Sequence, residues 1–352
     1  MPPAEVAQVG WDLGGAHVKV AALDARGRAV AALQVPCALW RGLDQLEQAL
    51  EQAVAGLPAG AADARHAATM TGELTDLFAD RSEGVQRIVA TLKARFGQRH
   101  LRVFAGERGL LEPDQALRCW SEVASANWLA TAQLVAGHLA DALLVDIGTT
   151  TTDLVAVRGG RVQTAGRTDF ERLVSGELVY TGVVRTALMA VADAIEFEGL
   201  RVPLMAESFA TTADVYRLTG ELDERCDQHA SADGSEKTPP ASARRLARMI
   251  GLDARDRPLQ SWQRLAASFR ATQLDRIRRA AQQVVLRAAV APAGPMVAAG
   301  SGAFLVPELA RELHRPVVGF ASLFESRIDD PVALSVCAPA VAVALLAQRG
   351  DM

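Results

Sequence analysis

The chain has 352 residues, half of them hydrophobic, and a formal net charge of −4 at pH 7. This length predicts two domains with large cores, and the weakly negative charge offers no electrostatic basis for binding nucleic acid. The four cysteines are dispersed, the N-terminus lacks the basic start and apolar core of a signal peptide, and prolines or an arginine interrupt the longest apolar stretches. We therefore expect a cytoplasmic protein without a disulfide framework or a membrane-spanning segment.

Residues 6–35 predict three strands, and the first turn among them suits close approach to a ligand. Asp12 ends the first strand, Gly14 and Gly15 follow in the turn, and Lys19 lies on the returning strand. Glycine lets the backbone approach a ligand closely, and a carboxylate such as Asp12 can hold hydrated Mg²⁺. This hairpin is a candidate site for a phosphate chain and its metal.

The following segments predict helices and strands in alternation. The spacing of apolar residues indicates helices over 43–57, 85–96 and 121–139 and strands beginning at 67 and at 101. The polar loop after the strand at 67 includes Glu73, a candidate substrate contact. Asp80 or Ser82 in the same loop could instead serve only to cap the next helix, and Asn127, at the start of helix 121–139, could likewise be a plain N-cap.

Residues 142–157 repeat the plan of the first hairpin, with two apolar runs on either side of a polar turn. The polar residues are Asp146, Gly148, Thr149, Thr150, Thr151, Thr152 and Asp153. Turn N–H groups and threonine hydroxyls can hold phosphate oxygens, although an ordinary hairpin with a threonine-rich turn would have the same sequence. The second Asp-x-Gly favours the phosphate interpretation, because it makes an internal repeat. Neither hairpin carries the glycine pattern of a P-loop or of a dinucleotide-binding fingerprint.

A polar stretch over 168–182 follows, and a helix is expected over 183–194. Asp169, Glu177 and Tyr180 in this stretch are candidates to contact substrate. A solvated loop with a helix cap is the alternative for each of them.

Farther along, Cys226 and His229 have the spacing of a zinc-ligand pair. A zinc site needs three or four ligands, and no second pair accompanies this one. The run 226–240 is polar and rich in Gly, Ser and Pro, so we interpret it as a mobile or substrate-facing loop. Helices are expected over 244–250 and 266–287, before a strand, a Gly300-Ser301-Gly302 turn and a helix start over 296–309.

The two hairpins resemble the phosphate-1 and phosphate-2 loops of the actin/Hsp70/sugar-kinase superfamily, and the Gly300-Ser301-Gly302 turn resembles its adenosine loop. The resemblance implies an α/β fold of two ribonuclease H-like domains around a central cleft. We expect these domains at 1–140 and 141–352, with the small-residue helix at about 331–349 packing back on the first domain.

The same resemblance implies a role for each candidate residue. Lys19 would contact phosphate, and Asn127 would face the phosphate chain. The expected catalytic residues are Asp12, Lys19, Asp146 and Asp153, and Asp12 and Asp146 would also hold the metal. The expected phosphate or nucleotide contacts are Gly14, Gly15, Asn127, Gly148, Thr149, Thr150, Thr151, Gly300, Ser301 and Gly302. The expected substrate contacts are Glu73, Asp169, Glu177 and Tyr180.

Several motifs together resemble the narrower hydantoinase/oxoprolinase-like group. They are Val-Asp-Ile-Gly-Thr-Thr-Thr-Thr-Asp at 145–153, Met-Thr-Gly-Glu-Leu-Thr-Asp at 70–76, Ser-Ala-Asn-Trp at 125–128, Glu-Ser-Phe-Ala-Thr-Thr-Ala-Asp-Val-Tyr at 207–216 and His-Ala-Ser-Ala-Asp-Gly at 229–234. Within the group, the chain is similar to short proteins linked to tetrahydromethanopterin-dependent one-carbon metabolism. Related methanofuran-biosynthesis enzymes join an aminomethyl-furan diphosphate to the phenol of a γ-glutamyl-tyramine and release pyrophosphate.

This resemblance implies a transferase that acts on a phosphorylated small molecule with Mg²⁺, and that can work without ATP. Two other functions stay open at this point. An ATP-dependent small-molecule kinase or amidohydrolase would use the Gly300-Ser301-Gly302 turn for a nucleotide, and a non-catalytic nucleotide-binding scaffold would polymerise in the manner of actin. The sequence leaves the choice between a monomer and a homodimer open as well.

Overall fold

The computed structural model describes residues 6–350 and divides the chain into two compact units. The first unit contains the chain up to Ala142, the segment Val155–Gln163 and the chain from Val318 onward. The second unit contains Leu143–Leu154 and Thr164–Val317. The sequence predicts two domains with a single boundary at 140/141. The units differ from those domains, because two later segments of the chain pack with the N-terminal residues.

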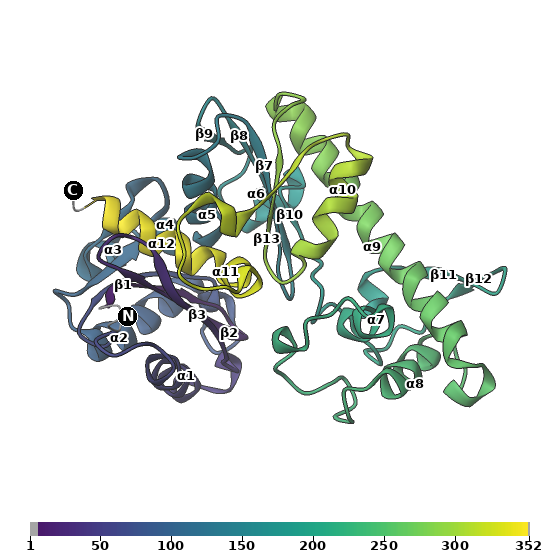
Figure 1. The fold of residues 1–352 in the computed structure, drawn as a ribbon. Helices are drawn as coiled ribbons and strands as arrows, with labels where there is room; N and C mark the ends of the chain where they lie inside the picture. Colours follow the sequence, from purple (N-terminus) through teal and green to yellow (C-terminus); the bar gives the residue numbers. More distant parts are fainter. Residues whose placement is uncertain (1–5, 351–352) are drawn as a thin grey trace. The chain divides into compact units, whose positions relative to one another are not determined.

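The first unit is built on one six-stranded sheet with the order β3-β2-β1-β4-β5-β6 (Figure 1). Its strands are β1 (Val6–Leu13), β2 (His17–Asp24), β3 (Ala29–Pro36), β4 (Arg65–Met70), β5 (Leu101–Phe104) and β6 (Leu110–Leu111). Strand β2 is antiparallel to both β1 and β3, whereas β4 is parallel to both β1 and β5. The prediction of three strands over residues 6–35 is confirmed.

Helices cover this sheet. They are α1 (Leu43–Ala55), α2 (Arg81–Phe96), α3 (Pro113–Arg118), α4 (Trp120–Val123), α5 (Asn127–Ala136), α11 (Pro331–Val336) and α12 (Ala338–Gly350). Helix α2 begins at a cap, since the side chain of Asp80 accepts from the backbone N–H of Glu83. The single helix expected over 121–139 is wrong. Ser125 has a φ of 51°, outside the helical range, so the backbone turns between α4 and α5.

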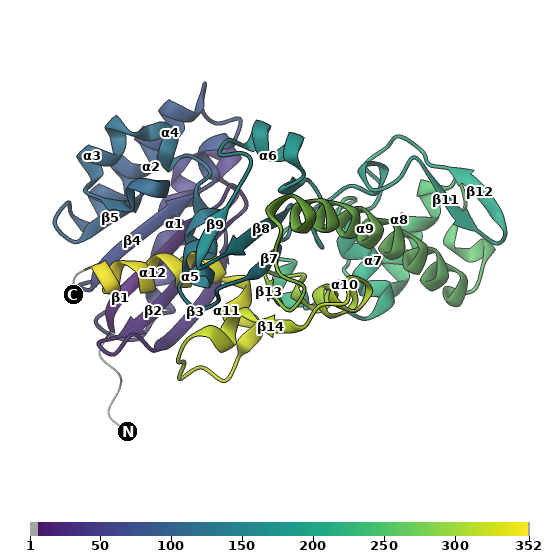
Figure 2. The same cartoon turned by 90° about the horizontal axis from the view of Figure 1, so that it is seen from above.

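Helix α12 packs on β1, β2, β4 and α5, and Figures 1 and 2 show it lying along the purple strands of the sheet. Small residues make this close approach possible. A Cβ on Gly10 of β1 would lie 1.9 Å from the carbonyl oxygen of Ala340. The alanine- and valine-rich sequence of the C-terminal helix therefore reflects direct contact with the sheet.

A buried histidine anchors the aromatic part of this core. The indole N–H of Trp11 donates to Nδ1 of His66 at 3.0 Å, and the His66 ring stacks on Phe96 with ring centres 3.9 Å apart. Because Nδ1 accepts this bond, the ring is neutral and carries its proton on Nε2. Burial lowers the pKa of His66 from 6.5 to about 4.

We expect His66 to make the protein less stable in mild acid. Below pH 6.5 the unfolded chain binds a proton at His66 that the folded chain does not bind until the pH falls to about 4. Stability is therefore fully present above pH 6.5 and falls across this window, by up to about 3 kcal/mol from this residue. Urea unfolding across the window would measure the slope. Across the same window, the stability of His66→Gln, which keeps a hydrogen-bond acceptor, should fall by up to about 3 kcal/mol less than that of the wild type. An equal fall in both proteins would contradict the lowered pKa of His66.

The second sheet repeats the strand order of the first. Its order is β10-β8-β7-β13-β14, and β9 pairs with β8. The strands are β7 (Ala142–Ile147), β8 (Thr152–Arg158), β9 (Arg161–Gln163), β10 (Leu178–Val179), β13 (Met296–Ala299) and β14 (Val317–Gly319). Strand β13 is parallel to β7, as β4 is parallel to β1. The internal repeat in the sequence thus corresponds to a repeat of the sheet.

The second unit also contains helices and a small hairpin. They are α6 (Asp169–Ser175), α7 (Thr212–Thr219), α8 (Pro239–Met249), α9 (Leu259–Ala288), α10 (Val306–Glu312), and the hairpin of β11 (Ala194–Phe197) and β12 (Leu200–Pro203). Long helix α9 runs past α7, α8 and β11 (Figures 1 and 2). The residues that bind these elements together include Leu246, Trp262 and Phe269, all buried. Within residues 6–350, no helix has the length and apolar character needed to cross a membrane.

The helix expected over 183–194 is wrong. The structure has only the short 3-10 turn Leu188–Ala190 in this range. The backbone N–H of Leu188, which a helix would pair with the Val184 carbonyl oxygen, donates instead to the carbonyl oxygen of Ala210, and the Val184 carbonyl oxygen accepts from the N–H of Ala213. Donors used in this way are not available for helix formation.

Candidate functional site

The first Asp-x-Gly hairpin joins β1 to β2 within the first unit. The N–H of Gly14 donates to the carbonyl oxygen of His17 at 2.9 Å and closes the turn. Asp12 and Lys19 are cross-strand partners, and the Nζ of Lys19 lies 3.9 Å from Oδ2 of Asp12. A Cβ on Gly15 would lie 2.7 Å from the Thr75 side chain. The hairpin therefore combines a buried carboxylate, a nearby cation and a crowded glycine turn.

Asn127 orients the Asp12 carboxylate. Its Nδ2 donates to Oδ1 of Asp12 at 3.3 Å, and its own Oδ1 accepts from the backbone N–H of Trp128. Asn127 is the first residue of α5, and Ala126 occupies the N-cap position. The alternative that Asn127 is a plain N-cap is therefore wrong. The side chain joins the helix start to the first hairpin.

Glu73 lies in the interior of the first unit. It follows β4 in a short 3-10 turn, and its Oε1 accepts from the hydroxyl of Ser125 at 2.8 Å. A Cβ on Gly84 would lie 2.6 Å from the Glu73 carbonyl oxygen. This packing favours a structural role for Glu73, which braces the link between α4 and α5. The sequence, in contrast, predicts that Glu73 contacts substrate.

The second Asp-x-Gly hairpin has the same turn as the first. The N–H of Gly148 donates to the carbonyl oxygen of Thr151 at 2.8 Å, which is the equivalent of the Gly14–His17 bond. Asp146 is buried near the end of β7, and Thr149 is buried in the turn. Both hairpins therefore present a strand-end carboxylate beside a tight four-residue turn. The repeated sequence therefore encodes the same hydrogen-bonded turn twice.

The segment 181–186 braces the second turn, and the sequence did not identify it. Gly182 packs so closely that a Cβ there would lie 2.4 Å from the backbone carbon of Thr149. The N–H of Arg185 donates to the Thr149 carbonyl oxygen at 2.8 Å, which fixes a cationic residue beside the turn. Burial lowers the pKa of Arg185, and the nearby Tyr180 opposes that shift. The sequence signal was the Thr181-Gly182 pair with an arginine three residues after the glycine.

The Gly300-Ser301-Gly302 turn meets the end of β7 in the second unit. Gly300 has a φ of +81°, and a Cβ there would lie 2.3 Å from Oδ1 of Asp146. The N–H of Gly302 donates to the carbonyl oxygen of Ile147 at 2.7 Å. The Ser301 hydroxyl is buried and has no hydrogen-bond partner among residues 6–350. A carboxylate and an unsatisfied buried hydroxyl at adjoining strand ends fit a polar ligand or a hydrated metal ion.

Two predicted site carboxylates have structural partners in the second unit. Asp153 forms an ion pair with the buried Arg172 at 2.9 Å. Glu177 accepts from the N–H groups of Ala165 and Gly166 and forms an ion pair with Arg287. Carboxylates held in this way stabilise loops, and they are poorly placed to accept a substrate proton.

The remaining predicted substrate contacts lie on α6 and after β10. Asp169 is the first residue of α6, whose start has a Thr168–Glu171 capping box. Tyr180 directly follows β10, is about half exposed, and borders a groove along α9. Across residues 6–350, no group of three or more His, Cys, Asp and Glu side chains is arranged to hold a metal ion.

Comparisons with known proteins agree with the motifs. The family model for hydantoinase/oxoprolinase matches residues 65–349. A relative from Methanocaldococcus jannaschii, (4-{4-[2-(gamma-L-glutamylamino)ethyl]phenoxymethyl}furan-2-yl)methanamine synthase, is 31% identical over 70% of this chain and 72% of its own length. The synthase of the same name from Methanococcus vannielii is 32% identical over 32% of this chain and 50% of its own length.

Among solved structures, a nucleotide-free acetone carboxylase aligns with 97% of this chain and 70% of its own, with a TM-score of 0.58 and 11% identity. This likeness concerns the fold alone. Together with the repeated strand order, it confirms the α/β fold of the actin/Hsp70/sugar-kinase type that the hairpins predict. The chain belongs to the hydantoinase/oxoprolinase family.

Proposed function

We propose that this protein is a transferase that forms an aryl–alkyl ether in the biosynthesis of a methanofuran-type cofactor. It joins an aminomethyl-furan diphosphate to the phenol of γ-glutamyl-tyramine and releases pyrophosphate. The observation that carries the proposal is the pair of equivalent Asp-x-Gly turns, each suited to phosphate. The name of the Methanocaldococcus jannaschii relative supports it, since that name describes a phenoxymethyl-furan ether.

The reaction breaks the bond between the furan methylene carbon and the diphosphate oxygen, and the bonding electrons leave with pyrophosphate. The phenol oxygen forms the new bond to that carbon, and its proton passes to a base or to solvent. A phenol has a pKa of about 10, so its oxygen needs a base or a nearby cation to become a better nucleophile. The departing pyrophosphate needs positive charge and hydrogen-bond donors. Arg185 and the N–H groups of the phosphate-2 turn would supply positive charge and donors for it, and Lys19 with the N–H groups of the first turn offers the same chemistry in the other unit.

A magnesium ion fits this chemistry. Asp146 would hold Mg²⁺ through its waters, and Asp12 is the equivalent metal-binding candidate of the first turn. The unsatisfied Ser301 hydroxyl, in the turn that meets the end of β7, suits such a hydrated ion. When bound, the ion would neutralise charge on the diphosphate. The structurally paired Asp153 and Glu177 need take no part in the reaction. We also propose that the protein acts in the cytoplasm, where its four cysteines, none of which forms a disulfide in the structure, would stay reduced.

A product assay tests the function. The purified protein is incubated with Mg²⁺, the furan diphosphate and γ-glutamyl-tyramine, and the ether and pyrophosphate are measured together. We expect both products in equal amounts without ATP. Ether formation that depends on ATP, or ATP hydrolysis without ether, would favour the ATP-dependent alternative and overturn the proposal.

Arg185 provides a separate prediction, because its backbone is bonded to the phosphate-2 turn. Arg185→Ala should weaken pyrophosphate binding by about tenfold to a hundredfold, the effect of losing a hydrogen bond from a charged donor. Arg185→Lys, which keeps the charge, should lose less. Calorimetric titration with pyrophosphate and Mg²⁺ would measure both variants. Arg201→Ala, on β12 away from this turn, serves as the control and should bind like the wild type.

A further inference from the structure

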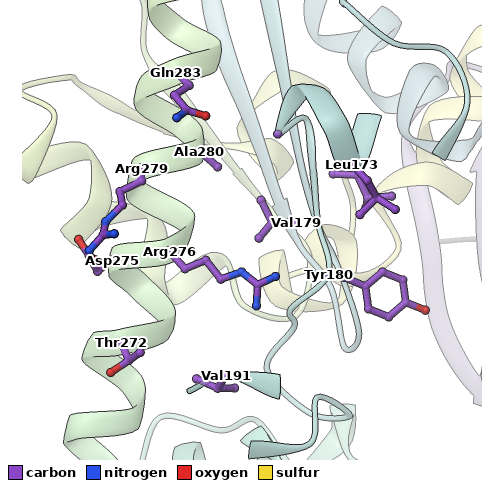
Figure 3. Close-up of a pocket in the computed structure, with 12 residues that line it drawn as sticks. Leu173, Val179, Tyr180, Val191, Thr272, Asp275, Arg276, Arg279, Ala280 and Gln283 are labelled. Atoms are coloured by element: carbon purple, nitrogen blue, oxygen red, sulfur yellow. Dashed lines mark ion pairs between the residues drawn. The ribbon is translucent and has the colours of Figure 1, made fainter. Parts of the chain in front are cut away.

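The second unit carries a surface groove that the phosphate chemistry leaves unused. It lies between β10 and α9 and has a volume of about 410 Å³, within the range of small-molecule sites. Val179, Val191 and Ala280 give it apolar lining, and Thr272 and Arg276 add polar groups (Figure 3). Such a mixture suits a small molecule with an apolar body and a charged end.

Arg276 is the charged lining residue whose guanidinium has N–H donors left for a ligand. Its Nη1 donates to the carbonyl oxygen of Ala190 at 3.1 Å, and it has no ion pair with any described residue from 6 to 350. The neighbouring Arg279 is different, since it forms an ion pair with Asp275. Asp275 and Arg279 also line the groove, and Figure 3 shows them beside each other, while Arg276 extends from α9 toward Val179 and Tyr180. A guanidinium has five N–H donors and pairs well with a carboxylate.

The groove is connected directly to the phosphate-2 turn. Gln273, one turn before Arg276 on α9, donates to the Thr181 hydroxyl and to the Gly182 carbonyl oxygen, both at 2.8 Å. Gly182 in turn packs against Thr149. Within β10, Val179 pairs with Thr152 of β8. The same short segment therefore forms one wall of the groove and one support of the turn.

We propose that this groove binds the acceptor, an aryl compound with a carboxylate-bearing tail. The apolar body of the acceptor would lie on Val179 and Val191, and a carboxylate of its γ-glutamyl group would pair with Arg276. The inference rests on the proposed function for the identity of the acceptor. The groove itself is defined by its own residues and can be tested without turnover.

Calorimetric titration of γ-glutamyl-tyramine and of tyramine tests the assignment. Arg276→Ala should weaken γ-glutamyl-tyramine binding by about tenfold to a hundredfold, and Arg276→Lys by less. Binding of tyramine, which has no carboxylate, should not change. Arg264→Ala is the matched control, because Arg264 lies on the same helix, does not line the groove and bonds to Ser261. Thermal unfolding would verify that each variant is folded.

The outcomes separate this inference from the proposed function. If the ether forms but Arg276→Ala binds γ-glutamyl-tyramine like the wild type, the groove assignment is wrong and the function stands. If binding depends on Arg276 but no ether forms, the function is wrong and the groove stands. If γ-glutamyl-tyramine neither binds nor reacts, both are overturned.

Discussion

Replacing Asp146 by asparagine is expected to lower kcat for ether formation by about a thousandfold, in the range found when a key charge-stabilising group is lost. Asp146 is the next-to-last residue of β7, beside the phosphate-2 turn, and a Cβ on Gly300 would lie only 2.3 Å from its Oδ1. Asparagine keeps the size of the side chain but removes its charge. The loss would therefore fall on the metal and the departing diphosphate, with the packing preserved.

Three measurements support the interpretation of that variant. Asp146→Asn should also lose most of its Mg²⁺-dependent pyrophosphate affinity by calorimetry, while its thermal unfolding stays close to that of the wild type. Asp141→Asn, immediately before β7, is the control and should keep full activity. Turnover by Asp146→Asn within about tenfold of the wild type, a loss of about 1.4 kcal/mol in transition-state stabilisation, would refute a role in catalysis.

Replacing Asp214 by alanine is expected to destabilise the protein by about 3–5 kcal/mol, the usual cost of leaving a buried charge without its partner. Oδ1 of Asp214 accepts from Nε and Nη2 of Arg245, at 2.9 and 2.7 Å. The Arg245 side chain is 0% exposed, and its second partner, Asp233, is 23% exposed. Loss of Asp214 would leave the buried guanidinium with too few acceptors.

Denaturant unfolding would measure this loss of stability. Arg255→Ala is the control, since its guanidinium is 86% exposed in a surface pair with Asp253 and such pairs contribute little. The midpoint for Arg255→Ala should therefore not move. If Asp214→Ala lost less than about 1 kcal/mol, in the range of a surface pair, the buried network would have little effect on stability.

The same network speaks against mobility of the loop over 226–240, one of the two alternatives that its composition predicts. Its composition predicts a mobile or substrate-facing loop, but Arg217 and Lys237 hold Asp227, and Arg245 holds Asp233. These ion pairs anchor the loop to α7 and α8. Their partners are separated along the sequence, and composition alone gives no sign of them.

The sequence by itself determined the features that depend on neighbouring residues. Alternating apolar runs around Asp-x-Gly predicted both hairpins, because a tight turn between strands is a local structure. The repetition of that motif also indicated the repeated sheet, and the small residues of α12 indicated close packing. In each case, residues adjacent in sequence carry the whole structural signal.

Only the tertiary structure decided which polar residues serve the candidate site and which serve the fold. Asp153 and Glu177 have the same chemistry as Asp146, yet arginines in other segments hold the first two as structural partners. Arg185 is a site candidate because its segment, predicted to be a helix, instead forms backbone hydrogen bonds with the phosphate-2 turn. A side chain's role here depends on partners brought close by folding, and single-sequence patterns do not contain those long-range contacts.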